Sequence, residues 1–122
     1  MLSALLRKKR GDDGEQTALD LLQGDGLRLV QRNFRCKLGE IDLVMQEREV
    51  LVFVEVRVRK NAAFGSASDS ITVHKQRRLI LAAQYFLQTH REWANAACRF
   101  DAVTITGNNA PEWCRDAFQV ST

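Results

Sequence analysis

The feature that most constrains the fold is the stretch of residues 39–60, GEIDLVMQEREVLVFVEVRVRK. It contains two runs rich in Val, Ile, Leu and Phe, Glu40–Gln46 and Val50–Arg59, which are typical of buried strands. The link between the runs is short, so we expect them to form an antiparallel hairpin. Acidic residues interrupt both runs, and they determine what the hairpin can do.

Alternation along each strand predicts which side chains share a face. In the second run one face is entirely valine, and the other carries Glu55 and Arg57. In the first run one face is apolar, and the other carries Asp42. The apolar sets are Ile41, Leu43 and Met45 in the first run, and Val50, Val52, Val54, Val56 and Val58 in the second.

The two apolar sets should lie on the same side of the sheet, because a slip of one residue would turn one of them to the opposite face. This register pairs Val44 with Phe53, and Asp42 with Glu55. A two-residue turn at Arg48–Glu49, although a poor match for a tight primed turn, and a four-residue loop both keep the pairing. Two carboxylates would then lie opposite each other, with Cβ atoms about 5 Å apart.

Like charges placed directly opposite destabilise a strand pair, so a compensating group is expected. Arg57 is the nearest positive side chain by sequence, and a retained proton is another solution. A divalent cation is a third, since Mg²⁺ commonly binds one or two carboxylates at about 2.0–2.1 Å together with waters. A buried ion network without any such role remains an alternative.

Glu15 is a candidate third acid. It precedes Ala18, Leu19 and Leu22 by three, four and seven residues, which places it on the inward stripe of a helix. The alternative is an ordinary acid in the first turn, where the helix dipole favours negative charge.

The remaining pattern predicts an α/β fold with a mixed sheet flanked by helices, in the order α-β-β-β-α-β with a candidate further edge strand. The expected elements are a helix over Asp12–Gln23, a strand over Leu27–Asn33, the two strands above, a loop over residues 60–70, a helix from a cap at Ser70 or Thr72 to about Arg91, a strand over Arg99–Thr106 and an edge strand over Ala117–Ser121.

A chain of 122 residues suits one domain, 1–122, with residues 1–11 forming a basic N-terminal segment that need not be ordered. No apolar run approaches the ~20 residues that span a bilayer, and the opening MLSALLRKKR reverses the order of a secretory signal. We therefore expect a cytoplasmic protein without a membrane partner. Three widely spaced cysteines predict neither a zinc site nor a disulfide framework.

The net charge of +3 is concentrated in three basic clusters, at residues 7–10, 57–60 and 75–78. Such clusters suit phosphate contacts, although a solvated surface explains any one of them equally well. Lys75 begins the inward stripe of the second long helix, so it either supplies an ammonium group to a site or is an exposed first-turn lysine. Trp93 and Trp113 could stack on bases, but such residues more often pack in the core or at a subunit contact.

Several segments resemble the YraN family of small bacterial proteins, which is similar to archaeal Holliday-junction resolvases within the PD-(D/E)XK, restriction-endonuclease-like superfamily. The match runs from Gly14 to about Ile105, and the GEIDL and VFVEV pair is its specific part. The matching segments are GEQTAL at 14–19, RNFRCKLGEIDLV at 32–44, VFVEVRVRK at 52–60, FGSA at 64–67, HKQRRL at 74–79 and RFDAV at 99–103.

The resemblance implies a Mg²⁺- or Mn²⁺-dependent endonuclease with Asp42 and Glu55 as metal ligands and Glu15 completing the catalytic set. The last motif position, usually lysine, is Arg57 here, which keeps the charge but cannot act as a base. The implied partner is DNA rather than RNA, branched or structured, and a homodimer is compatible with the resemblance. Residues expected to follow the nucleic-acid backbone are Arg59, Lys60, Lys75, Arg77 and Arg78.

Three functions stay open on sequence alone. The first is a metal-dependent phosphodiesterase acting on nucleic acid. The second is a nucleic-acid-binding module of the same fold that has lost cleavage, which Arg57 favours. The third is an interaction domain with a buried ion network and no nucleic-acid role, which predicts no affinity for DNA or RNA even at low salt.

Overall fold

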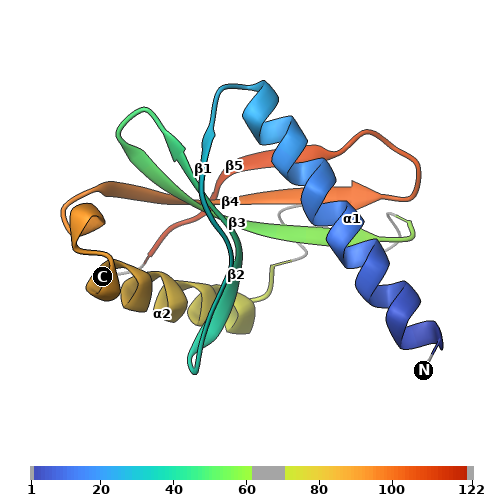
Figure 1. Ribbon diagram of the computed structural model, residues 1–122, viewed down its shortest axis with the longest axis horizontal. Coiled ribbons are helices and arrows are strands. Elements are labelled where there is room, and N and C mark those ends of the chain that lie inside the picture. The colour runs from blue at the N-terminus through green and yellow to red at the C-terminus, as the bar shows by residue number, and fades with distance from the viewer. Residues whose placement is uncertain (1, 62–70, 121–122) are drawn as a thin grey trace.

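Residues 2–61 and 71–120 are described by the computed structural model, with side chains described from residue 13 onward. Figure 1 shows the arrangement of the elements along the chain. They are α1 (Leu2–Gly24), β1 (Arg28–Cys36), β2 (Gly39–Glu47), β3 (Val50–Arg59), α2 (Val73–Thr89), a short 3-10 helix η2 (Arg91–Trp93), β4 (Ala97–Thr106) and β5 (Glu112–Phe118).

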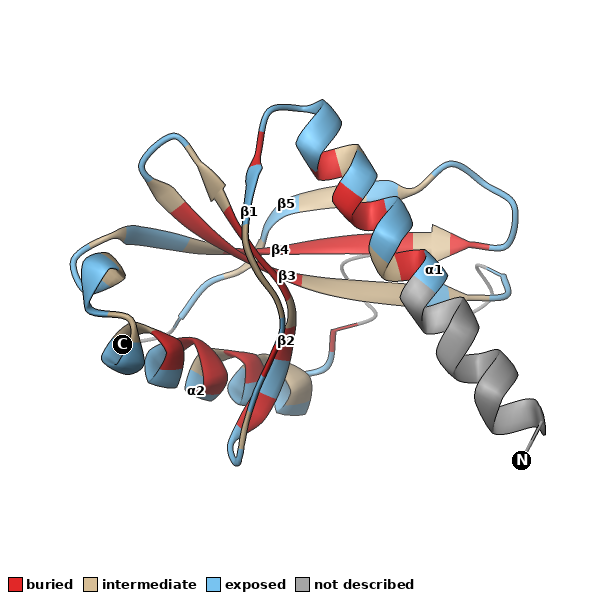
Figure 2. Cartoon of the chain, viewed as in Figure 1, coloured by how far each residue is buried: buried red, intermediate tan, exposed pale blue. Residues whose placement is uncertain are grey.

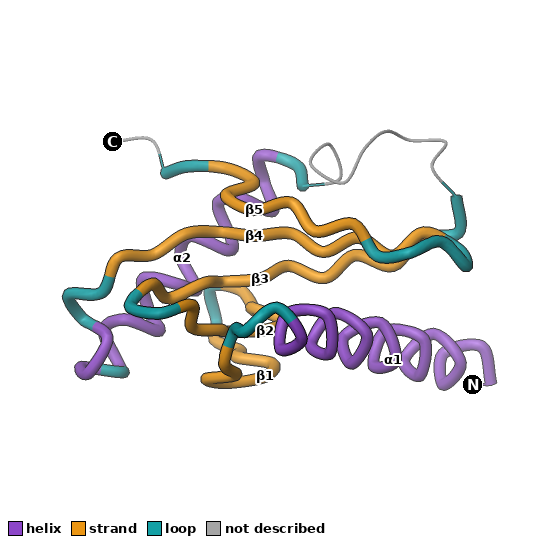
Figure 3. The backbone as a smooth tube through the Cα atoms, turned by 90° about the horizontal axis from the view of Figure 1, so that it is seen from above, coloured by secondary structure: helices purple, strands orange, loops and turns teal. Residues whose placement is uncertain are grey.

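The five strands form one sheet in the order β1-β2-β3-β4-β5. Three neighbouring pairs are antiparallel, and β3 and β4 are parallel because α2 lies in the crossover between them. The two helices cover opposite faces of this sheet (Figures 1 and 3). The expected α/β fold, a mixed sheet flanked by helices, is therefore confirmed.

Each helix encloses a separate apolar core against the sheet, and Figure 2 shows the buried residues lining the inward side of both helices. Between α1 and the sheet, Leu22 packs with Val52 and Val54. Between α2 and the sheet, Phe86 packs edge-on against Phe53, with ring centroids 5.9 Å apart. The valine face of β3 thus lies toward α1, and the face of β3 that carries Glu55 lies toward α2.

The predicted register of the β2–β3 hairpin is confirmed toward the turn, whereas the predicted Asp42–Glu55 pair lies just beyond the ladder, which begins at Leu43 and Val54. Val44 pairs with Phe53, and the ladder closes at Glu47 and Val50. The connection is the two-residue turn Arg48–Glu49, in which Arg48 adopts a φ of 55°. The strongly apolar strands therefore impose the tight turn although its residues are a poor match for it.

One predicted face of β2 is wrong. Ile41 belongs to the core beneath α2, whereas Leu43 belongs to the core beneath α1. The sheet bends here, and Figure 1 shows β1 and β2 curving together away from the straighter β3, β4 and β5. Asn33 of β1, which the register places opposite Asp42, has a φ of 51°. The bend lets Ile41 leave the face that strict alternation predicts.

Several boundaries of helices and strands also differ from those predicted. The helix α1 begins at Leu2 rather than near Asp12, because the preceding residues are mostly Ala, Leu, Lys and Arg, which favour helix. The second long helix ends at Thr89. The edge strand is Glu112–Phe118 rather than Ala117–Ser121, and it pairs with β4.

Other predictions have mixed outcomes. The cap at Thr72 is confirmed, since its hydroxyl accepts a hydrogen bond from the backbone N–H of Lys75. Ser70 and most of the predicted loop over residues 60–70 lie outside the described residues. The three cysteines are free thiols. Within the described residues no helix is both long and apolar enough to cross a membrane.

Two glycines let the helices approach the sheet closely. A Cβ atom on Gly14 would collide with the side chain of Val58, so α1 lies directly on β3. A Cβ atom on Gly39 would lie 2.7 Å from the backbone oxygen of Arg78, so the start of β2 lies directly against α2. Because Glu15 and Glu40 follow these glycines, both close contacts place an acidic residue near the bend of the sheet.

Candidate functional site

Two acidic side chains meet where β2 diverges from β3. The last residues paired in this ladder are Leu43 and Val54, and Asp42 and Glu55 come next on each strand. The Asp42 carboxylate accepts a hydrogen bond of 2.7 Å from the backbone N–H of Val56. That bond replaces the interrupted ladder and fixes the Asp42 side chain against β3, beside Glu55.

The electrostatics of this pair are unfavourable for two negative charges. Burial, followed by the negative charge of Glu55, raises the pKa of Asp42 from 3.8 to about 7, although the Val56 N–H opposes the shift. Burial likewise raises the pKa of Glu55 from 4.5 to about 7, against the opposing charge of Arg57. At neutral pH the pair therefore holds close to one proton, or needs a cation in its place.

Glu15 lies within electrostatic reach, because its charge raises the pKa of both Asp42 and Glu55. The Asn33 amide nitrogen donates to both Glu15 carboxylate oxygens, at 3.0 and 3.2 Å, when the amide is oriented with nitrogen toward them. Arg32 adds an ion pair at 3.9 Å. The carboxylate of α1 is thus fastened to β1 at the residue opposite Asp42.

The basic residues at the end of β3 have different surroundings. Arg57 is half-buried, and its charge acts on Glu55 as the shared strand face predicts. Arg59 donates a hydrogen bond of 2.9 Å to the Thr106 hydroxyl of β4. Lys60 is exposed just beyond the strand. Only Arg57 among these three therefore takes part in the electrostatics of the acidic pair.

A pocket of about 140 Å³ opens beside Glu55, between β2 and the first turns of α2. Among described residues it is lined by Glu40, Glu55, Lys75, Arg78 and Leu79. Glu40 was not predicted as a site residue, although its charge raises the pKa of both members of the acidic pair. It is mostly exposed and forms an ion pair with Arg35 at 3.4 Å.

The basic residues of the cluster at 75–78 lie on two different sides of the helix α2. Lys75 and Arg78 line the pocket beside Glu55, whereas Arg77 lines a separate groove formed by the outer side of α2 and the C-terminal residues Gln119 and Val120. Residues three apart on a helix share a side, and their immediate neighbour does not. The structure therefore brings two of these three cations to the pocket beside Glu55.

A divalent cation suits the chemistry of the Asp42–Glu55 pair. Both groups offer oxygen ligands, and their raised pKa values report a negative charge that the surroundings compensate incompletely. Among the side chains that the structure describes, in residues 13–61 and 71–120, no group of three His, Cys, Asp or Glu is close enough to hold a metal. Two protein carboxylates with waters is a usual arrangement for Mg²⁺.

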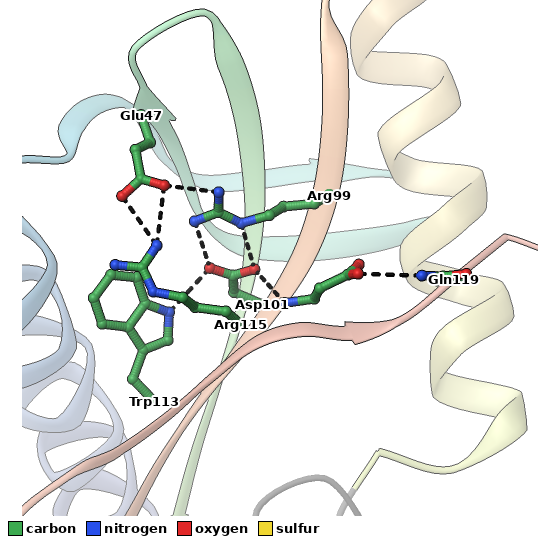
Figure 4. Close-up of polar contacts among 7 residues, drawn as sticks. Glu47, Arg99, Asp101, Trp113, Arg115 and Gln119 are labelled. Atoms are coloured by element: carbon green, nitrogen blue, oxygen red, sulfur yellow. Dashed lines mark hydrogen bonds and ion pairs between the residues drawn. The ribbon is translucent and has the colours of Figure 1, made fainter.

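A separate carboxylate, Asp101 of β4, is fully buried and was not predicted. Figure 4 shows its side chain between Arg99 and Trp113, with Arg99 and Arg115 both reaching Glu47 at the end of β2. The Asp101 side chain has no exposed surface, and it accepts from the Arg99 guanidinium at 3.0 and 3.2 Å. It also accepts at 2.9 Å from the Trp113 ring nitrogen and from the Asp116 backbone.

This second cluster is fully paired. Arg99 and Arg115 both donate to Glu47, at 2.8 and 3.0 Å, and these bonds lower the Glu47 pKa. The Arg115 guanidinium lies 3.8 Å from the centre of the Trp113 ring. Trp113 therefore joins β5 to β4 rather than presenting its face to a base. An acid within the apolar strand RFDAVTIT was its signal in the sequence.

Comparison with known proteins finds relatives that match the segments forming the candidate site. The profile of the uncharacterised protein family UPF0102 matches residues 14–105. A UPF0102 protein of Nitrosococcus oceani is 52% identical over 118 residues, covering 94% of this chain and 95% of the relative. A UPF0102 protein of Alkalilimnicola ehrlichii is 55% identical over 108 residues, covering 88% and 85%.

A UPF0102 protein of Pseudomonas putida is 47% identical over 123 residues, covering 98% of this chain and 99% of the relative. The matches extend over nearly the whole chain, and the profile includes both acidic strands and α2. The resemblance to a family of small bacterial proteins is confirmed at this level, and the wider PD-(D/E)XK assignment stays a prediction. The chain belongs to the uncharacterised protein family UPF0102.

Proposed function

We propose that this protein is a metal-dependent phosphodiesterase that cleaves nucleic acid at the Asp42–Glu55 pair. The observation that supports the proposal most strongly is the convergence of these two partly buried carboxyl groups, both with raised pKa, beside a pocket lined by Lys75 and Arg78. An acidic pair that needs a cation, next to basic side chains, suits a substrate whose phosphate carries the negative charge.

Asp42 and Glu55 would supply the protein oxygens that hold Mg²⁺ or Mn²⁺. Asp42 is oriented for this by its bond from the Val56 N–H, and a hydrogen bond with Glu55 keeps the two carboxyl groups together. Glu15, fastened to Asn33 and Arg32, would orient water near the pair from one strand away. A bound divalent cation would supply a water of lowered pKa and would polarise the phosphate.

Arg57 would stabilise the charge that develops on the phosphate oxygens. Its guanidinium already acts on Glu55, so it lies close to where the substrate would bind. A fixed positive group aimed at developing charge lowers the barrier because it needs no reorganisation during the reaction. Arginine stays protonated at all relevant pH values, so removal of a proton from water falls to another group.

Nucleic acid would be held mainly through its phosphates. Arg59 and Lys60 lie at the end of β3 beyond Arg57, and the backbone of the basic cluster at residues 7–10 lies in α1. Contacts of this kind fix the register of the chain on its substrate but do not read the base sequence. We therefore propose DNA with a branched or otherwise distorted structure as the substrate class.

A second candidate is a binding protein of the same fold without cleavage activity. The observation that favours it is Arg57, at the position where the superfamily pattern has lysine. The site would then hold nucleic acid, and the affinity would fall steeply with rising salt because binding releases counterions.

The test is incubation of branched, duplex and single-stranded DNA and RNA with Mn²⁺, with cleavage followed on gels. We expect products with the wild-type protein, and none with Glu55→Gln or with excess chelator. Glu49→Gln is the matched control, because it removes an exposed carboxylate from the turn of the same hairpin. Arg57→Lys should retain or increase the activity.

Retarded but intact substrate under every metal condition would support the binding protein instead. The absence of both cleavage and binding at low salt would contradict both candidates, and would favour an interaction domain with a buried ion network.

A further inference from the structure

The first turns of α2 carry two cations, Lys75 and Arg78, that line the pocket beside Glu55. The Thr72 hydroxyl caps the helix by accepting from the Lys75 backbone at 3.2 Å, and the Gln76 amide donates to the Ile71 carbonyl at 3.1 Å. At the next turn, the backbone of Arg78 lies against Gly39. The two bonds therefore cap the start of the helix, and the Gly39 contact places its second turn against β2.

The pocket between these elements has one acidic and one basic wall. Glu40 and Glu55 come from the sheet, and Lys75 and Arg78 come from the helix. No ion pair of 4.0 Å or less joins the two walls among the described residues. The walls are thus apart, and a group between them would contact cations on one side and carboxylates on the other.

The side chain of Lys75 can contact a bound phosphate from a direction that is not open to Arg57 on β3. Arg57 follows the acids along the same strand, and its charge is already opposed to that of Glu55. Lys75 is half-buried on the helix and lines the pocket from the side opposite Glu55, and its ammonium group carries three donors. An ammonium group acts as a compact point charge on phosphate oxygens.

We propose that Lys75 contacts the scissile phosphate, and that Arg78 contacts a neighbouring phosphate of the same strand. Lys75 would donate hydrogen bonds to a non-bridging oxygen, opposite the cation held by Asp42 and Glu55, and would transfer no proton. The ligand class is accordingly a phosphodiester chain with at least two consecutive phosphates. This inference rests on the proposed function and identifies the residues of the same site that contact the substrate.

Cleavage kinetics test the role of Lys75. Lys75→Ala should lower kcat by about 10²–10³-fold with a smaller change in KM, because the contact is strongest when charge develops on the phosphate. Lys75→Arg keeps the charge and should recover activity to within about tenfold of wild type. Arg91→Ala is the matched control, since it removes one exposed charge beyond the far end of α2, on the order of 20 Å away.

Equal kinetics for Lys75→Ala and Arg91→Ala in an active protein would overturn the inference and leave the proposed function intact. A purely structural role for Lys75 makes different predictions. Under that role Lys75→Ala would lower the melting temperature, and Lys75→Arg would not restore kcat.

A second measurement does not depend on cleavage. Inorganic phosphate is titrated into ¹⁵N-labelled protein without metal, and the backbone amides are followed by NMR. We expect saturable shifts at Lys75 and Arg78, and their loss in Lys75→Ala, while Arg91 and Arg77 stay unchanged. Saturable shifts in a protein that cleaves nothing would keep the phosphate pocket and reject the phosphodiesterase. The absence of shifts at both residues would reject the pocket.

Discussion

Two groups of carboxylates lie toward opposite ends of β2, and they differ in how their charge is compensated. Asp101 accepts four hydrogen bonds, two of them from one guanidinium, so burial leaves its charge compensated. Asp42 and Glu55 are partly buried and compensated less well: the charge of Glu55 raises the pKa of Asp42, and the pKa of Glu55 stays raised by burial despite Arg57 and a hydrogen bond with Asp42. The comparison distinguishes a structural acid, which links strands, from acids whose charge is available to bind a ligand.

The largest expected effect is at the compensated acid. Asp101→Asn should lower the free energy of unfolding by about 3–5 kcal/mol, because it removes the charge partner of the enclosed Arg99 and turns an amide toward donors. Urea denaturation measures the change as a shift in midpoint. A loss below about 0.5 kcal/mol, typical of a surface substitution, would show that the cluster does not hold β4 and β5 together.

The uncompensated acids should respond in the opposite direction. Glu55→Gln should raise the free energy of unfolding at pH 8 by roughly 1–3 kcal/mol, because it removes one of two facing charges and each unit of pKa shift corresponds to about 1.4 kcal/mol. The same variant should lose cleavage. A destabilisation equal to that of Asp101→Asn would mean that Glu55 is a structural acid as well.

The pH dependence follows from the same shifts. Between the ordinary pKa values of 3.8 and 4.5 and the folded value of about 7, the folded protein holds protons that the unfolded chain has released. The pair's contribution to stability is therefore complete below about pH 4 and is lost as pH rises through 7. Thermal melts from pH 5 to 8 should show this decline, and millimolar Mg²⁺ should reduce it.

Glu55→Gln supplies the control for this profile, because its melting temperature should depend less on pH across the same range. An identical decline in the variant and the wild type would assign the pH dependence to other groups.

The smallest effect is expected at Glu47, which is partly exposed at the rim of the compensated cluster. Hydrogen bonds from Arg99 and Arg115 lower its pKa, so its contribution is present above pH 4.5 and is lost in acid. Glu47→Gln should destabilise by about 0.2–1 kcal/mol at pH 7, less at high salt. A loss as large as that of Asp101→Asn would make the two acids equal partners, contrary to their difference in burial.

The hairpin shows how much of the site can be predicted from local sequence. Two apolar strands with a short link fix the pairing of Val44 with Phe53, and this pairing brings Asp42 toward Glu55. The face of Ile41 could not be predicted, because it depends on the bend opposite Asn33. A strict alternation rule assumes a regular strand, and the sheet departs from one where the acids converge.

Contacts between segments that are far apart in the sequence could not be predicted from it. Arg99, Asp101 and Trp113 each have an ordinary surface or core interpretation, and only the pairing of β4 with β5 and with β3 brings them to Glu47. The division of the basic cluster on α2 likewise requires the position of the helix on the sheet.

The most direct test of the account is a crystal soaked in Mn²⁺ at pH 8 and measured for anomalous scattering. We predict one peak about 2.1 Å from an oxygen of Asp42 and an oxygen of Glu55, with none at Asp101, whose charge is already compensated. A pair of carboxyl groups hydrogen-bonded to each other through a shared proton, with no anomalous density between them, would contradict the central claim.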